Sequence, residues 1–396
     1  MDKLFFSEEH TMLVNMVADF AKSEIEPVAR ELDHNSRFPK DIITKMGDLG
    51  LMGIPIPEQY GGAGMDTVAY AAAIMELAKA DASVAITVAA HTSLGTIPIV
   101  LSGSEEQKKD YVPKLASGKM LGAFGLTEPD AGSDAGATKT TAEKNGDGYI
   151  VNGGKIFITN AGVAGILSFT TKIIENGINK GIGAFIVPTD IVGLTIGPPE
   201  KKMGWKASDT RQLFFENMSV SEANMIAGPA DGFKTFLKTL TIGRISIAAL
   251  AVGTAQAAYE SSLRYSKERS AFGKKIHQFQ PVSFKLADMA TQIEAAKLLT
   301  FHAAWKKDQG LDIVKEAAMA KLFSSEVAMK TTTDAIQVHG GYGFVKDYDI
   351  ERYFRDAKIL EIGEGTSEIQ RLIISMEILK TIEDVVLKAQ ITINQF

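Results

Sequence analysis

The spacing of hydrophobic residues changes character twice along this chain, near residues 120 and 232, and these changes constrain its fold most. The stretches before and after have the spacing of amphipathic helices, several of them longer than about 20 residues. Between them lie short runs rich in β-branched and aromatic residues, separated by turn signals such as Asn145-Gly146-Asp147-Gly148. Strands that follow one another without helices between them favour an antiparallel barrel or sandwich over a doubly wound sheet.

We therefore predict an α+β protein of three domains. Residues 1–120 form an N-terminal helical domain, residues 121–232 a middle antiparallel β-barrel or sandwich, and residues 233–396 a C-terminal four-helix bundle. A chain of 396 residues is too long for one small core and is long enough for about two or three domains.

Composition and motifs exclude several functional classes. The formal net charge of -6 gives no basis for binding nucleic acid or an anionic membrane. The absence of cysteine excludes disulfides, thiolate metal sites and cysteine nucleophiles, and the 6 histidines are scattered, so we predict no metal site. The motifs GxGxxG, HExxH and GxSxG and a complete P-loop are absent, which argues against dinucleotide-fold, zinc, hydrolase and kinase classes.

One long apolar run, residues 82–103, contains no Asp, Glu, Lys or Arg. It includes Gly95 and Pro98 and has no basic cluster beside it, so we predict a pair of buried core helices broken between these residues and no membrane span. The N-terminal sequence MDKLFFSEEH lacks the basic region of a signal or transit peptide. We expect a cytoplasmic protein, or one of the mitochondrial matrix if the chain is a mature eukaryotic form.

A segment near the C-terminus reads DAKILEIGEGTSEIQR. Glu364 lies there between Gly363 and Gly365, which let a ligand come close, so its carboxylate is a candidate general base. In the alternative interpretation the segment is only the start of a helix, with Thr366 or Ser367 as the N-cap and Glu364 solvated. The segment alone leaves both interpretations open.

Four other segments combine residues suited to holding a ligand. They are 124–134 (FGLTEPDAGSD), 155–161 (KIFITNA), 269–273 (RSAFG, with Gln280 downstream) and 337–343 (QVHGGYG). The hydroxyls and backbone N–H groups of the first can wrap a polar heteroaromatic ring or a phosphate. Taken singly, each segment also fits an ordinary structure: a β-turn, a half-buried strand, an inter-helix connection and a helix C-cap.

In this order and at this spacing, the four segments, the EGT run at Glu364 and the α–β–α layout resemble the acyl-CoA dehydrogenase family, in particular its short-chain or butyryl-CoA members, over essentially the whole chain. The resemblance implies α,β-dehydrogenation of a short- to medium-chain or branched acyl-CoA to the trans-2-enoyl-CoA, as in fatty-acid β-oxidation. It also implies FAD as the hydride acceptor, electron-transfer flavoprotein as the next acceptor, and a homotetramer in which subunits share each FAD. A same-fold acyl-CoA oxidase-like flavoprotein and a non-catalytic DNA- or partner-binding homologue are the alternatives.

Carried over position by position, the resemblance assigns the site residues. Glu364 is the catalytic base. The residues implied in FAD binding are Phe124, Leu126, Thr127, Ser133, Phe157, Ile158, Thr159, Arg269, Phe272, Gln280, Gln337, Val338, Gly340, Gly341, Thr366, Ser367 and Glu368. Those implied in substrate binding are Ser133, Thr241, Arg244 and Gly365.

Members of the family place the base either in this loop or on a bundle helix, immediately before an arginine. Here the helix position is Gly243, before Arg244, so the resemblance implies Glu364 as the base and Glu361 as a structural neighbour. It also implies the backbone N–H of Glu364 as a hydrogen-bond donor to the thioester oxygen. Exclusion of water is expected to raise the pKa of Glu364.

Three positions depart from the family pattern. Gly363 replaces the aromatic residue found before the base in most such members, which predicts room for branched or bulkier acyl chains. Thr241 stands where short- and medium-chain members have Asp, which puts a contact to the CoA portion in doubt. Phe157 stands where Trp is usual, so that stacking on a flavin is kept and the indole N–H is lost.

Overall fold

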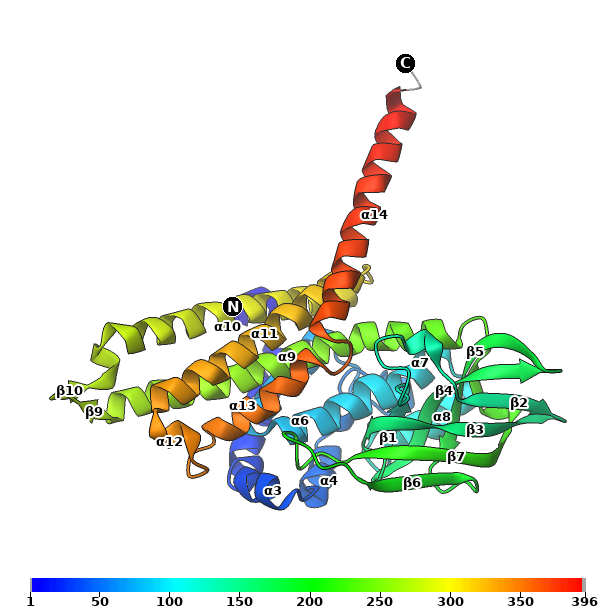
Figure 1. Ribbon diagram of the computed structural model, residues 1–396, viewed down its shortest axis with the longest axis horizontal. Helices are drawn as coiled ribbons and strands as arrows, with labels where there is room; N and C mark the ends of the chain where they lie inside the picture. Colours follow the sequence, from blue (N-terminus) through cyan, green and yellow to red (C-terminus); the bar gives the residue numbers. More distant parts are fainter. Residues whose placement is uncertain (1, 394–396) are drawn as a thin grey trace.

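The computed structural model describes the backbone of residues 2–393 and the side chains of residues 4–380. It confirms the predicted order of a helical part, a β-sheet part and a second helical part (Figure 1). In this view the long helices lie horizontally, the sheet is at one end of them, and helices α3 (Ala29–Asn35), α4 (Lys40–Asp48) and α6 (Ala82–Ala89) of the N-terminal part lie below them.

Serine side chains cap the N-termini of two helices in the N-terminal part. Ser7 and Ser104 each accept a hydrogen bond from the backbone N–H three residues on, and the side chain at that position returns a bond to the cap. The elements are α1 (Asp2–Phe5), α2 (Glu8–Phe20), the π-helical η1 (Ala21–Ile25), α3 (Ala29–Asn35), α4 (Lys40–Asp48), the 3-10 turns η2 (Leu51–Gly53) and η3 (Glu58–Tyr60), α5 (Thr67–Ala80), α6 (Ala82–Ala89), the π-helical η4 (Ala90–Thr96), α7 (Ile97–Ser102) and α8 (Glu105–Ala116).

The apolar run of residues 82–103 is a core helix, as predicted, because 83% of its most apolar window is buried. The other helix long and apolar enough to span a membrane, residues 232–268, is likewise mostly buried. The predicted break is wrong, because α6, η4 and α7 follow one another without interruption. The helix instead widens into π-type turns just before Pro98, which falls in the first turn of α7.

The middle part is one open sheet in the order β6-β7-β3-β2-β4-β5-β8, with β1 also paired to β4. Most neighbours are antiparallel, as predicted, but β1 and β2 run parallel to β4. The sheet is sandwich-like and does not close into a barrel. Its strands are β1 (Leu121–Gly125), β2 (Thr141–Asn145), β3 (Gly148–Thr159), β4 (Ala164–Glu175), β5 (Ile178–Pro188), β6 (Leu194–Pro199), β7 (Thr210–Ser221) and β8 (Met225–Ala227), with the 3-10 turns η5 (Ala135–Ala137) and η6 (Glu222–Asn224).

The C-terminal part is built on three long helices that pack against one another: α9 (Gly232–Glu268), α10 (Gln280–Asp308) and α11 (Val314–His339). The remaining elements are the short hairpin of β9 (Ser270–Ala271) and β10 (Lys274–Lys275), the 3-10 turn η7 (Ile276–Gln278), α12 (Gly341–Phe344), α13 (Ile350–Lys358), the 3-10 turn η8 (Ile359–Glu361) and α14 (Ser367–Ile393). The predicted fourth long helix, α14, starts against α11 and then rises out of the bundle (Figure 1), and α5 of the N-terminal part packs on α9 and α10 instead.

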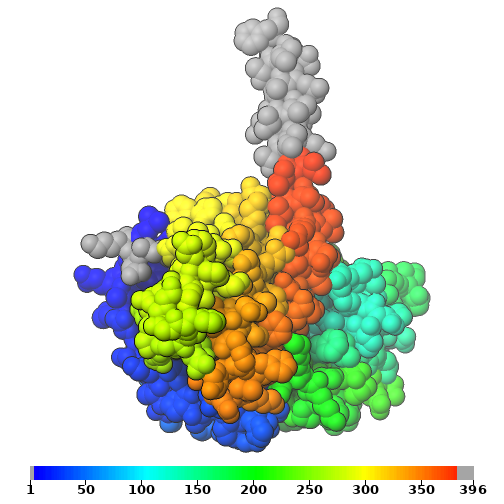
Figure 2. Space-filling model, turned by 60° about the vertical axis from the view of Figure 1, so that its left-hand side comes forward, coloured from blue at the N-terminus to red at the C-terminus, as the bar shows by residue number. Residues whose placement is uncertain are grey.

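The two helical parts share one hydrophobic core, which extends from α2 to η8. The sheet has a core of its own, and a third cluster joins the sheet to α7, α8 and the start of α9. In Figure 2 the orange surface, around residues 340–360, borders the blue N-terminal helices, the yellow-green bundle and the green sheet. The turn between η8 and α14, which carries Glu364, comes next in the chain after these residues.

Candidate active site

Glu364 lies in a tight turn whose backbone is held in an uncommon conformation. Its φ of +53° is in the left-handed region, which residues other than glycine seldom adopt, and Gly365 follows at +93°. The buried Gln370 donates from Nε2 to the carbonyl oxygens of Glu364 at 3.3 Å and Gly365 at 2.9 Å. Lys321 of α11 donates to the same Gly365 oxygen at 2.7 Å. The turn is therefore fixed by side chains from two helices.

The carboxylate of Glu364 occupies the space left by the absent side chain of Gly243. A Cβ atom placed on Gly243 would lie 2.3 Å from Glu364 Oε2 and 3.1 Å from Cδ2 of Leu94. Oε2 is out of reach of solvent and has no hydrogen-bond partner within the described residues. Glu364 as a whole is half-buried, so its carboxylate is solvated at most in part, which differs from the interpretation of a solvated side chain.

The capping half of that interpretation is confirmed. Thr366 Oγ1 accepts a hydrogen bond from the N–H of Ile369 at 3.3 Å, so Thr366 caps α14. Ser367 is buried and Glu368 is exposed in the first turn. One short segment thus both starts a helix and presents a buried carboxylate.

Burial raises the pKa of Glu364 from its ordinary value of 4.5 to about 7, and the positive charges of Lys321 and Arg244 oppose the rise. A carboxylate with this pKa is matched to proton transfer near neutral pH. Arg244 is itself buried, and its guanidinium donates to Thr241 Oγ1 at 3.3 Å. Glu361, by contrast, forms an ion pair with Lys358 at 2.6 Å, which fits its prediction as a structural neighbour.

The loop after β1 is anchored by a charged pair that the sequence did not reveal. Glu128 points into the protein, where it accepts hydrogen bonds from Lys155 Nζ at 2.7 Å and from the backbone N–H of Lys139 at 2.5 Å. Lys155 also donates to the carbonyl oxygen of Leu126 at 3.2 Å. Burial alone would raise the pKa of Glu128, but the Lys155 cation holds it below its usual range. The pair ties the loop to β3.

The same loop lies beside the segment that contains Phe157. The N–H of Ile156 donates to the carbonyl oxygen of Thr127 at 2.9 Å. Phe157 has a φ of +59° at a register shift of β3, and its ring is 64% exposed. Phe124 instead stacks on Phe236 of α9, with 4.2 Å between ring centroids. Of the other predicted residues nearby, Leu126 and Ile158 are buried, Thr127 and Thr159 are half-buried, and Ser133 is exposed.

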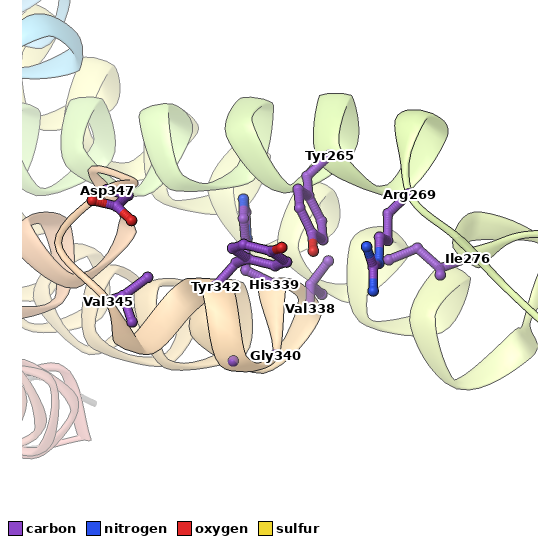
Figure 3. A pocket seen from close by; sticks show the side chains of 10 residues that line it. Tyr265, Arg269, Ile276, Val338, His339, Gly340, Tyr342, Val345 and Asp347 are labelled. Atoms are coloured by element: carbon purple, nitrogen blue, oxygen red, sulfur yellow. The ribbon is translucent and has the colours of Figure 1, made fainter.

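The remaining predicted residues gather at the far end of the bundle, around a pocket of ≈ 620 Å³ (Figure 3). Arg269, which forms no ion pair within the described part of the chain, lines this pocket beside the ring of Tyr342, with its Cζ 5.7 Å from the ring centroid. Open space faces the backbone of Gly340 and Gly341. Val338 also lines the pocket. Phe272 is 95% exposed, and Gln280 and Gln337 are exposed as well.

This pocket suits a nucleotide. A guanidinium without an ion-pair partner can bind phosphate, and aromatic faces can bind a base. Sequence reasoning missed Tyr265 and His339, whose rings stack with centroids 4.4 Å apart in the pocket lining. The His339 of the QVHGG run was the available signal.

The two groups of predicted residues do not meet within the chain. Arg244 lies on α9 and Arg269 directly follows its last residue, Glu268, so about 37 Å of helix separates them. Figure 1 shows the β9–β10 hairpin at one end of the bundle and the sheet at the other.

This α–β–α fold is that of a class of flavin-dependent oxidoreductases. Three family models match the chain: the N-terminal domain of acyl-CoA dehydrogenase at residues 7–119, its middle domain at 123–218 and its C-terminal domain at 230–379. The chain belongs to the acyl-CoA dehydrogenase family, whose members are oxidoreductases acting on CH–CH groups.

Individual relatives agree. The probable acyl-CoA dehydrogenase YngJ of Bacillus subtilis (strain 168) is 52% identical over 94% of this chain and 99% of its own length. The structure of butyryl-CoA dehydrogenase from Megasphaera elsdenii superposes with a TM-score of 0.92 at 42% identity, covering 94% of this chain and 99% of that one. An acyl-CoA dehydrogenase from Bacillus anthracis, solved in complex with FAD, gives 0.90 at 37% identity, covering 96% and 68%.

Proposed function

We propose that this protein is an FAD-dependent acyl-CoA dehydrogenase that converts a short- to medium-chain acyl-CoA into the trans-2-enoyl-CoA, with Glu364 as the base. The observation that carries the proposal is the Glu364 carboxylate, buried against Gly243 with a pKa raised to about 7. Similarity to butyryl-CoA dehydrogenase supports the substrate class.

The chain's own groups account for the proton transfer. The ionised Glu364 takes the α proton of the thioester, and its Oε2 is shielded from the water that would otherwise weaken this base. As negative charge develops on the thioester oxygen, the backbone N–H of Glu364 is the proposed donor to it. Arg244 and Thr241, which are joined by a hydrogen bond, are the proposed substrate-binding residues of α9. When bound, FAD supplies the acceptor for the β hydride.

FAD fits the residues present. Phe157 offers an exposed ring, and the hydroxyls of Thr127 and Thr159 are half-buried beside it for the flavin. Arg269 and the open space beside Gly340 and Gly341 suit the pyrophosphate.

Because the flavin-side and nucleotide-side residues lie at opposite ends of α9, we infer that each FAD is held by two subunits. The flavin half then lies against the sheet of one subunit, and the pyrophosphate and adenosine lie in the pocket of another. A homotetramer is the assembly we propose, in line with the family resemblance. Electron-transfer flavoprotein is the proposed acceptor, and the bacterial relatives support a cytoplasmic location.

Gly363 supports tolerance of bulky acyl chains. A Cβ atom added there would meet Ile359 O at 3.5 Å and Ile359 Cγ1 at 4.0 Å, both ordinary contacts, so the backbone at Gly363 leaves room for a side chain. The Gly363→Tyr variant should therefore keep turnover of butyryl-CoA and lose at least about tenfold in kcat/KM for isobutyryl- and isovaleryl-CoA.

The test is anaerobic titration of the FAD-loaded protein with a panel of acyl-CoAs, followed by turnover with electron-transfer flavoprotein or oxygen as acceptor. Bleaching of the flavin by butyryl-CoA, and faster turnover with electron-transfer flavoprotein than with oxygen, is the expected result. A panel in which no acyl-CoA bleaches the flavin would refute the proposed function. Unchanged preference in Gly363→Tyr would refute only the role of Gly363.

A further inference from the structure

Lys321 on α11 is fully buried and, within the described residues, has no carboxylate as an ion-pair partner. The other fully buried lysine, Lys155, pairs with Glu128 at 2.7 Å. The hydrogen bond of Lys321 goes instead to a backbone oxygen, that of Gly365, at 2.7 Å. Because a buried ammonium without a paired carboxylate is costly, this arrangement calls for an explanation.

The bond from Lys321 reaches the peptide unit that follows Glu364. Gln370 of α14 donates to the same oxygen and also to the carbonyl oxygen of Glu364. Side chains from both α11 and α14 therefore bind this turn. A Cβ atom on Gly365 would lie 2.6 Å from Gln370 Nε2, which shows how closely this amide is seated. The two side chains thus hold Glu364 in its left-handed conformation.

Lys321 also places a positive charge near the carboxylate of Glu364. The charged and titratable groups around Glu364 are Lys321 on α11, Arg244 on α9 and the buried phenol of Tyr70 on α5. Glu361 of η8 and Glu368 of α14 act on Lys321 in turn. Of the two cations, Lys321 has the larger effect on Glu364, and it opposes the rise in pKa that burial causes.

We propose that Lys321 is a positioning residue for the dehydrogenation: it holds the Glu364 turn through Gly365 O and supplies the opposite charge that faces the carboxylate. Gln370 is the neutral second holder of the same turn. This inference rests on the proposed role of Glu364 as the base.

Three variants separate the two contributions. Lys321→Met removes both bond and charge, so kcat should fall by about 100-fold with little change in KM, because the base is misplaced. The acid limb of the kcat/KM profile should also move to higher pH, since the ionised form of Glu364 loses a cation that favours it. Lys321→Gln keeps a donor without the charge; it should regain part of kcat and keep the pH shift. Gln370→Leu should lower kcat without that shift.

Controls distinguish positioning from general structure. Lys330→Met removes an exposed lysine of the same helix, paired with Asp334 at the surface, and should leave kcat and the pH profile unchanged. FAD content and thermal unfolding are measured for every variant. A folded, FAD-loaded Lys321→Met protein with wild-type kcat and pH profile would overturn the proposal, and the profile of Lys321→Gln decides the matter if the methionine variant does not fold.

A second readout is independent of turnover. At pH 8 the loss of thermal stability on Lys321→Gln should be larger with Glu364 present than in the Glu364→Gln background, because only the carboxylate needs the cation. Equal losses in both backgrounds would contradict the coupling of Lys321 to Glu364. Full acyl-CoA turnover by Glu364→Gln would instead refute the base assignment and leave this coupling measurable.

Discussion

At the scale of single residues, the position of the base depends on an absent side chain. Gly243 in the middle of α9 leaves the space that the Glu364 carboxylate fills, and Leu94 closes it from the other side. The family resemblance identified Gly243 as the position where some members carry the base. The structure gives a physical reason why a side chain at position 243 and the Glu364 carboxylate exclude each other: the two would overlap.

The variant Gly243→Ala tests this packing. The added Cβ would lie 2.3 Å from Oε2 and displace the carboxylate, so kcat should fall by at least about tenfold. The free energy of unfolding should change little. Alanine favours a helix over glycine by about 1 kcal/mol, and this gain offsets the crowding around the added Cβ atom.

Steady-state kinetics and urea unfolding measure the two effects. Ser261→Ala, on the same helix, is the control for a small substitution that leaves the site untouched. Wild-type kcat in Gly243→Ala would show that the carboxylate does not need this space.

At the scale of elements, the flavin-side loop depends on charges from two segments. The pattern of residues 124–134 indicated a turn, and KIFITNA indicated a strand, both correctly. No periodicity could show that Glu128 and Lys155 pair in the interior, because the pairing depends on how the loop folds back onto β3. Likewise, β2 has the polar sequence TAEKN, so its place between β3 and β4 could not be predicted from hydrophobic alternation.

Lys155→Met should destabilise the protein by about 3–5 kcal/mol, because it leaves the Glu128 carboxylate buried without its cation. The FAD content of the purified protein should fall with it, since the loop loses its anchor. Urea unfolding and the ratio of flavin to protein absorbance measure both effects.

Lys139→Met is the matched control, because Lys139 pairs with Asp130 at the surface and such pairs contribute about 1 kcal/mol or less. If Lys155→Met bound FAD as fully as Lys139→Met, the anchoring role of the buried pair would be wrong.

At the scale of the whole molecule, the sequence predicted the order of the three parts because each has its own periodicity. It could not predict that α14 leaves the bundle or that α5 packs beside α9 and α10. Hydrophobic spacing shows which face of a helix is buried, but it does not show which element packs against that face. The same limit applies to the site: motifs grouped the ligand-binding residues, and only the length of α9 shows that they form two clusters.

Sharing of FAD between subunits predicts complementation. Glu364→Gln and Arg269→Ala should each be nearly inactive, the first for lack of a base and the second for weak FAD binding. When the two variants are co-expressed with different tags, the mixed assembly should regain activity. A site that takes Glu364 from one subunit and Arg269 from the other is intact.

Purification through both tags and measurement of acyl-CoA turnover tests this. About half of the sites in a mixed pair should be active. Mixed assemblies as inactive as their parents would show that each subunit builds its site alone.

The central claim is that Glu364, with its pKa raised to about 7 by burial, removes the α proton. The most direct test is the rate of anaerobic flavin reduction by butyryl-CoA between pH 5.5 and about 9. The ionised carboxylate is the active form, so the rate should rise with pH and level off above about 7.

In Glu364→Gln the rate should fall by at least about 10⁴-fold at every pH while FAD remains bound, because the amide cannot accept the proton. Glu361→Gln, three residues earlier, should behave as wild type. Rapid flavin reduction by Glu364→Gln, or a wild-type rate independent of pH across this range, would contradict the account.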